Sequence, residues 1–224
     1  MAEPRDYVVW GSSGHARVLD EVIRSNGDRI VALFDNSPLA VSAVNSVGLL
    51  GGKVAWDAWV AATPGLESKR GIVAIGSGRG RDRLTIQEMM SSAGLVFDVL
   101  VHRTAFVADT AHLGNGSQVL AMGVVAAGAV LGQGCVINHK ASVDHDSRVG
   151  DGVFVAPGAT VLGEVVIGDA STIGAGSVIL PRVRIGADSM IGAGAIVTQD
   201  VPSGAIVVGN PGRVSTLRWS STVE

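Results

Sequence analysis

A six-residue repeat is the most regular feature of the chain. From Val101 to Val197, every sixth residue is valine, isoleucine or leucine, and the register never slips. The fourth residue after each of these is small or β-branched. A helix cannot produce this pattern, because six residues are not a whole number of 3.6-residue turns, whereas short strands joined at corners can. The repeat therefore predicts an all-β domain over residues 101–201, a parallel β-helix whose large aliphatic side chains point inward.

Glycine recurs directly after the inward aliphatic residue in seven of these repeats. A corner between two strands would benefit from its permissive backbone, so we expect these glycines to relieve strain there. Cys135 falls in the small inward column, where a buried, unreactive thiol is expected.

Residues 6–100 follow a different pattern, in which apolar runs alternate with amphipathic stretches. The runs DYVVW, RIVALF and GIVAIG read as buried strands, and HARVLDEVIRSNG and RDRLTIQEMMSSAG read as helices. Strands that alternate with helices predict a small parallel α/β domain, Rossmann-like, over residues 1–100. Residues 202–224 are left as a C-terminal tail.

Composition narrows the possible partners and the compartment. Apolar residues make up 47% of the chain and aromatic residues only 4%, so the core is expected to be aliphatic. The net charge is −3 without any basic run, which argues against nucleic acid or a membrane surface as a partner. The single cysteine, the lack of a signal-like N-terminus and the lack of an 18-residue apolar run favour a cytoplasmic protein.

The segment VDHDSRVGD (143–151) contains polar residues that the repeat does not explain. His145 is in the second position after Val143, so it should point outward, and Asp146 could accept a proton from its imidazole. Such a pair fixes the tautomer and strengthens the other nitrogen as a base. Three interpretations remain at this point: a solvated histidine in a turn, a metal ligand, or a general base for acyl transfer. The candidate ligands His102, His112, His139 and His145 show no spacing that converges on one ion, so no metal is expected.

The glycine turn GSSGHA (11–16) lies between an expected strand and an expected helix. Amides at the start of that helix could receive a phosphate. The turn is not a full GxGxxG, so by itself it is weak evidence for a dinucleotide. Asp35 closes the second strand about 20 residues later, a spacing suited to a ribose hydroxyl.

Five segments in order carry a family resemblance over residues 6–214. They are GSSGHARV (11–18), AIGSGRGRDRL (74–84), INHKASVDHDSRVGD (137–151), APGATVLGEVVIG (156–168) and VVGNPGRV (207–214). Together they resemble the bacterial sugar O- and N-acetyltransferases of the hexapeptide acyltransferase superfamily, which include sialic acid O-acetyltransferases and N-acetyltransferases of nucleotide-linked amino sugars. The resemblance implies a left-handed β-helix with three hexads per coil. Residues 18 apart then stack, which places His145 between Ala127 and Gly163.

The resemblance also implies roles for individual residues. His145 matches the catalytic base and Asp146 the acidic partner that orients it. The matched substrate-binding positions are Ser13, Gly14, His15, Asp35, Asn36, Gly76, Arg81 and Asn138. Those matched to the acetyl-CoA site are Phe154, Gly163, Ala175, Gly209 and Pro211. Phe154 departs from the family, since close relatives often have there a histidine that contacts acetyl-CoA. His139 and Lys140 also replace smaller residues.

The sequence thus leads to one hypothesis and two alternatives. The hypothesis is a trimeric acetyltransferase that uses acetyl-CoA, needs no metal, and acetylates the amino group of a nucleotide-linked amino sugar, in particular a 4-amino-deoxy sugar, at a subunit interface. The first alternative is O-acetylation of a free sugar such as sialic acid. The second is a non-catalytic scaffold built on the β-helix.

Overall fold

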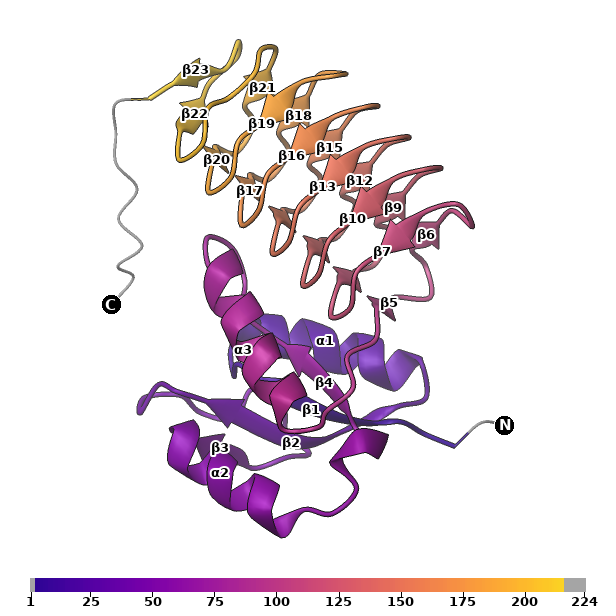
Figure 1. The fold of residues 1–224 in the computed structure, drawn as a ribbon, viewed down its shortest axis with the longest axis vertical. Helices are drawn as coiled ribbons and strands as arrows, with labels where there is room; N and C mark the ends of the chain where they lie inside the picture. Colours follow the sequence, from indigo (N-terminus) through magenta and orange to yellow (C-terminus); the bar gives the residue numbers. More distant parts are fainter. Residues whose placement is uncertain (1–2, 216–224) are drawn as a thin grey trace.

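The computed structural model describes residues 3–215, so residues 216–224 of the expected C-terminal tail lie outside the described residues. An α/β domain comes first, and its four parallel strands lie in the order β3-β2-β1-β4 (Figure 1). The strands are β1 (Asp6–Trp10), β2 (Arg29–Asp35), β3 (Leu49–Gly51) and β4 (Arg70–Val73). The helices are α1 (Gly14–Ser25), α2 (Gly52–Ala62) and α3 (Gly80–Ser92), with a short 3-10 helix at Leu66–Ser68. None of the described helices is long and apolar enough to cross a membrane.

The core of this domain departs from the aliphatic core that the composition predicts. Trp10 stacks on Phe34 with ring centroids 5.5 Å apart, and Trp56 packs edge-on against Phe34 at 5.1 Å. Trp59 lies 5.8 Å from Trp56. Trp10, Phe34, Trp56 and Trp59 are therefore gathered where α2 covers the sheet, and the expectation of an aliphatic core holds for the interior of the second domain.

The second domain is a left-handed parallel β-helix, as predicted. Its strands are β5 (Leu100–Val101), β6 (Phe106–Val107), β7 (His112–Leu113), β8 (Gln118–Val119), β9 (Val124–Val125), β10 (Val130–Leu131), β11 (Val136–Ile137), β12 (Ser142–Val143), β13 (Arg148–Val149), β14 (Phe154–Val155), β15 (Thr160–Val161), β16 (Val166–Ile167), β17 (Thr172–Ile173), β18 (Val178–Ile179), β19 (Arg184–Ile185), β20 (Met190–Ile191), β21 (Ile196–Val197), β22 (Ile206–Val208) and β23 (Arg213–Val214). Figure 1 shows the coils stacked as a tilted column above the α/β domain.

The coils form three flat faces. The docked face consists of β5, β8, β11, β14, β17, β20, β22 and β23; the open face of β6, β9, β12, β15, β18 and β21; and the third face of β7, β10, β13, β16 and β19. From β5 to β18, each strand pairs in parallel with the one 18 residues further on, for example Val136 with Phe154. At the end of the column β20 pairs with β22, and β22 pairs with β23 in antiparallel fashion. The inward aliphatic residues, among them Val125, Ile137 and Val149, form one buried cluster along the column. The register read from the sequence is therefore the register of the coils.

The glycines that follow the inward residues have a different role from the one expected. Left-handed backbone occurs two residues later, at Gly116, Gly134 and Gly152, and also at non-glycine residues such as Asp146. A Cβ at Gly114 would instead come within 2.5 Å of the backbone of the next coil. These glycines are needed because neighbouring coils approach closely, and not because the corner requires a positive φ.

The α/β domain packs on the docked face. Outward side chains of this face, including Val136 and Phe154, belong to the same buried cluster as Val9, Ala16 and Leu19 of the first domain. Buried apolar contact between the domains stabilises their relative position.

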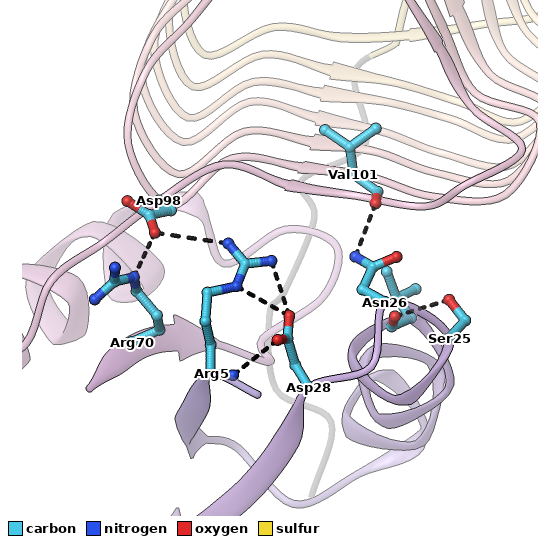
Figure 2. Close-up of polar contacts among 8 residues, drawn as sticks. Arg5, Ser25, Asn26, Asp28, Arg70, Asp98 and Val101 are labelled. Carbon is cyan, nitrogen blue, oxygen red and sulfur yellow. Dashed lines mark hydrogen bonds and ion pairs between the residues drawn. The ribbon is translucent and has the colours of Figure 1, made fainter. Parts of the chain in front are cut away.

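An ionic network closes the junction at the amino ends of the strands (Figure 2). Arg5 donates two hydrogen bonds to Asp28, at 3.1 and 2.8 Å, and lies 3.9 Å from Asp98. Arg70 also pairs with Asp98, and Asn26 donates to the carbonyl of Val101 at 3.2 Å. The segment that enters the β-helix is thereby tied to the first domain.

Candidate active site

His145 and Asp146 lie at the corner between the open and third faces. The backbone of Asp146 is left-handed, with φ of 57°, and its carboxylate lies 3.0 Å from Nδ1 of His145. The N–H of His145 donates to the Asp144 carboxylate at 2.7 Å. The imidazole is more than half exposed, so a substrate can reach it. The corner thus presents a histidine whose Nδ1 is hydrogen-bonded to Asp146 and whose Nε2 can accept a proton.

Surrounding carboxylates raise the pKa of His145 above its ordinary value. The hydrogen bond to Asp146 is the main cause, and the charges of Asp144, Asp146 and Glu164 add to it. Because Nδ1 donates to the carboxylate in the neutral ring, Nε2 carries the lone pair. The arrangement suits a general base more basic than free histidine.

Gly163 lies one coil beyond His145, where the 18-residue stacking places it. A Cβ at position 163 would come within 2.5 Å of Nε2 of His145. The carbonyl of His145 accepts a hydrogen bond from the N–H of Glu164 at 2.9 Å, which holds the two coils together. No protein group among residues 3–215 accepts from the N–H of Gly163. A bare backbone position with a free amide therefore lies beside the reactive nitrogen.

The glycine turn forms a second cluster, at the carboxyl ends of the strands in the α/β domain. Ser13 and Gly14 are exposed at the start of α1, and an added Cβ at Gly14 would meet no neighbour within 4 Å. Ser13 makes no side-chain cap, so the first amides of α1 are not satisfied by it. These amides and the positive end of the helix dipole form an anion-binding arrangement.

Asp35 connects this turn to the loop that follows β2. Its carboxylate accepts from the N–H of Ser12 at 2.6 Å and from the N–H of Ser37 at 2.8 Å. Asn36, between them, is exposed. Asp35 thus holds two loops at one edge of the sheet, and its remaining lone pairs are available to a hydroxyl.

His15 faces the β-helix. Its Nε2 lies 2.8 Å from Oε1 of Gln118, whose amide nitrogen donates to the carbonyl of Val73 at 2.9 Å. That second bond orients the Gln118 amide, so Nε2 of His15 is the donor. Burial lowers the pKa of His15, despite the opposing hydrogen bond, and the charge of Arg83 lowers it further. A neutral His15 with its Nδ1 as acceptor therefore bridges the glycine turn and the docked face.

Arg81 contacts the β-helix, whereas Gly76 contacts a buried arginine of its own domain. Arg81 makes a two-pronged ion pair with Asp188 of the β-helix, at 2.9 and 2.8 Å. The carbonyl of Gly76 accepts from Arg83, a residue that the sequence analysis did not single out. The signal for Arg83 was present, because it occupies the buried face of α3 with Gly80, Gln87 and Met90.

The residues matched to the acetyl-CoA site are dispersed. Phe154 is only 6% exposed and packs in the cluster between the domains, away from the corner of His145. Ala175 lies exposed at the corner between the docked and open faces, and its N–H has no acceptor within the described chain. Gly209 and Pro211 are exposed after β22.

The expected site residues therefore fall at two different corners. Asn138, His139 and Ala175 lie at the corner between the docked and open faces, next to His15. His145, Asp146 and Gly163 lie at the corner between the open and third faces. The width of the open face separates the two groups within one chain. Across residues 3–215, no three histidine, cysteine, aspartate or glutamate side chains gather closely enough to hold a metal ion.

A β-helix of six-residue repeats with an outward histidine–carboxylate pair defines a hexapeptide-repeat transferase. The family model "Bacterial transferase hexapeptide (six repeats)" matches residues 128–163 and 164–199, and the model "PglD N-terminal domain" matches residues 6–87. No curated protein sequence matches the chain.

Solved structures match both domains together. The acetyltransferase domain of PglB from Neisseria gonorrhoeae, in complex with acetyl coenzyme A, is 31% identical, with a TM-score of 0.84, and the match covers 95% of this chain and all of that one (100%). PerB from Caulobacter crescentus, in complex with CoA and GDP-perosamine, is 30% identical over 96% of this chain and 98% of that one, with a TM-score of 0.85. WeeI from Acinetobacter baumannii is 25% identical over 95% and 100%, with a TM-score of 0.82. The chain belongs to the sugar acetyltransferase family of the hexapeptide superfamily.

Proposed function

We propose that this protein transfers an acetyl group from acetyl-CoA to the amino group of a nucleotide-linked amino sugar, with His145 as general base. The observation that carries the proposal is the approach of His145 Nε2 to the bare backbone of Gly163, with Nδ1 held by Asp146. Two relatives support the substrates, since their structures contain acetyl coenzyme A in one case and CoA with GDP-perosamine in the other. The family resemblance favours a 4-amino-deoxy sugar.

We assign a chemical step to each of these groups. Nε2 of His145 takes a proton from the sugar amine as the nitrogen attacks the thioester carbonyl, and a C–N bond forms. The N–H of Gly163 donates to the oxyanion. When the C–S bond breaks, the imidazolium returns the proton to the CoA thiolate. A sugar amine is less basic than lysine, so part of it is already neutral near pH 7–8 and histidine is a sufficient base.

The nucleotide sugar is assigned to the α/β domain. Its phosphates fit the free amides at Ser13 and Gly14, and the carboxylate of Asp35 is suited to a ribose hydroxyl. His15 connects this end of α1 to Gln118 of the docked face, and the corner after the neighbouring strand β11 carries Asn138. We assign the thioester end of acetyl-CoA to the amide of Gly163, the pantetheine arm to the amide of Ala175, and the CoA nucleotide to the segment of Gly209 and Pro211.

The separation of the two corners favours a subunit-interface site. Residues that bind the sugar and the residue that removes its proton lie on opposite sides of the open face of one chain. The open face carries Phe106, which is 59% exposed, and its corner with the docked face carries Met122, which is 58% exposed. A homotrimer in which the open face of one chain meets a corner of the next would join the two groups and cover these apolar side chains.

Replacement of His145 by asparagine tests the proposal. Wild-type protein should acetylate at least one member of a panel of GDP-, UDP- and CMP-linked amino sugars in the presence of acetyl-CoA. His145→Asn should lose about 10²–10⁴-fold in kcat while it binds acetyl-CoA normally in calorimetry. Normal turnover by a folded His145→Asn variant would show that His145 is not the general base.

The same assay, with free sialic acid added to the panel, separates the alternative functions. Acetylation of free sialic acid, with no shift in melting temperature by any nucleotide sugar, would favour O-acetylation of a free sugar. A protein that binds no acetyl-CoA would be a scaffold and not an enzyme.

A further inference from the structure

Arg83 is the most deeply buried charged side chain among the described residues, with 0% exposure. It lies on the first turn of α3, where the chain passes from the end of β4 toward the β-helix. Its guanidinium makes no ion pair with any carboxylate in residues 3–215. A buried charge is costly unless hydrogen bonds compensate it, so its retention calls for a reason.

Four backbone carbonyls satisfy the guanidinium. Nη1 donates to Ile75 and Gly76 at 3.0 and 3.3 Å, directly after β4. Nε donates to Gly134 and Nη2 donates to Gly152, each at 2.6 Å, on two successive coils of the β-helix. One side chain therefore fixes the loop after β4 against the corner between the third and docked faces.

Neighbouring contacts show that this loop is held closely to the β-helix. The N–H of Gly78 donates to Oγ1 of Thr172 at 3.2 Å, and a Cβ at Gly80 would meet Ala170 within 2.9 Å. Arg81 adds its ion pair with Asp188. The loop of residues 74–79 forms one wall of the carboxyl edge of the sheet, next to the glycine turn, because Gly11 packs against Ala74.

The positive charge of Arg83 also acts on this edge. It remains cationic at neutral pH, although burial lowers its pKa to about 10. Its field reaches His15, whose pKa it lowers. Since the surrounding carbonyls carry only partial charges, a net positive charge remains under the loop and favours an anionic ligand above it.

We propose that Arg83 is a positioning residue for the nucleotide sugar: through the carbonyls of Ile75 and Gly76 it sets the loop that borders the substrate pocket, and its charge favours the substrate's phosphates. This inference rests on the proposed function, and it assigns Arg83 no contact with the substrate. Lysine has one charge centre and cannot reach four carbonyls in a fixed plane, so Arg83→Lys should retain only part of the effect.

The test compares Arg83→Met and Arg83→Lys with Arg70→Met. Arg70 joins the domains at the opposite end of the sheet, through its ion pair with Asp98. Arg70→Met therefore weakens the domain junction at a distance from the substrate site, and it serves as the control for a general loosening of the junction. Calorimetry with GDP, UDP and acetyl-CoA as probes, and steady-state kinetics, give the readout. For the nucleoside diphosphate that wild-type protein binds, we expect Kd to rise about tenfold in Arg83→Met and less in Arg83→Lys. In both Arg83 variants the Kd of acetyl-CoA should stay within about twofold of the wild-type value. Arg70→Met should match wild type in the Kd of the diphosphate and in the Kd of acetyl-CoA.

The outcomes separate the two proposals. Unchanged binding of the diphosphate in a folded Arg83→Met, or an equal loss of both ligands, would overturn the role of Arg83 alone. If Arg83→Met does not fold, the proposal is tested with Arg83→Lys, by the same comparison of the Kd of the diphosphate with the Kd of acetyl-CoA. Wild-type protein that binds neither diphosphate while still binding acetyl-CoA would overturn the assignment of a nucleoside-diphosphate sugar to the α/β domain, and the inference with it.

Discussion

The imidazole of His145 lies against the backbone of Gly163, so closely that a Cβ at position 163 would come within 2.5 Å of Nε2. Gly163 has no positive φ, so alanine fits its backbone without strain. The atoms that the added Cβ would meet belong to the imidazole ring of His145, which lies at the surface and can move at a low energetic cost. A substitution at Gly163 should therefore affect the chemistry much more than the fold.

Gly163→Ala should lower kcat about tenfold to a hundredfold, because the added methyl displaces the base from its working position. Its free energy of unfolding should change by less than about 1 kcal/mol. Gly48→Ala is the control, since a Cβ there meets no neighbour and the φ is ordinary. In the His145→Asn background the alanine should add no further loss; additive losses would show that Gly163 acts independently of the ring.

Asp146→Asn should move the pH profile of the reaction. The hydrogen bond to Asp146 is the main cause of the raised pKa of His145. A general base must be unprotonated, so activity rises as pH passes the pKa of His145 from below. Asparagine removes that stabilisation of the imidazolium, lowers the pKa, and should shift the acid limb of kcat/KM to lower pH. A limb that stays in place would show that another group titrates in the free enzyme.

Gly14→Glu should block the nucleotide sugar and leave the helix intact. An acidic residue in the first turn of α1 is favourable to the helix dipole, and an added side chain meets no neighbour there. The same charge repels a phosphate, so KM for the nucleotide sugar should rise about tenfold or more. KM for acetyl-CoA is the internal control. Gly14→Gln, uncharged and of equal size, should cause a smaller rise; an equal rise would indicate steric blocking and not charge.

Mixed oligomers test whether each site uses two chains. At nucleotide-sugar concentrations well below the wild-type KM, His145→Asn and Gly14→Glu are each expected to have about a tenth of wild-type activity or less. Mixed trimers that contain both variants should regain about a third of wild-type activity, because one of the three interfaces in each mixed trimer joins two intact parts. Oligomers purified through a different tag on each chain give the measurement. No recovery in such mixed oligomers would place the whole site within one chain.

The sequence predicted the β-helix well because its period is local and repeats throughout residues 101–197. It also predicted the contact between His145 and Asp146, because the repeat explains Val143 and Ser147 but not the polar residues between them. The α/β domain followed from strands that alternate with helices. These features depend on neighbours along the chain.

Other features depend on contacts between distant segments, and the sequence did not predict them. Phe154 occupies an outward position, but only the docking of the α/β domain decides that its face is buried. The same docking turns Arg81 toward Asp188 and encloses Arg83 between two coils. Asn138 and His145 are separated because they occupy different corners between the three faces of the β-helix.

Each coil contacts only the coils before and after it, and the known attachments of the first domain end at Asp188. His145 and Gly163 lie within the attached coils. Insertion of one 18-residue coil after β20 would therefore lengthen the column without moving His145, Gly163 or the docked domain, and would displace only the later segment of Gly209 and Pro211. In this architecture the length of the protein and the geometry of its chemistry can evolve separately.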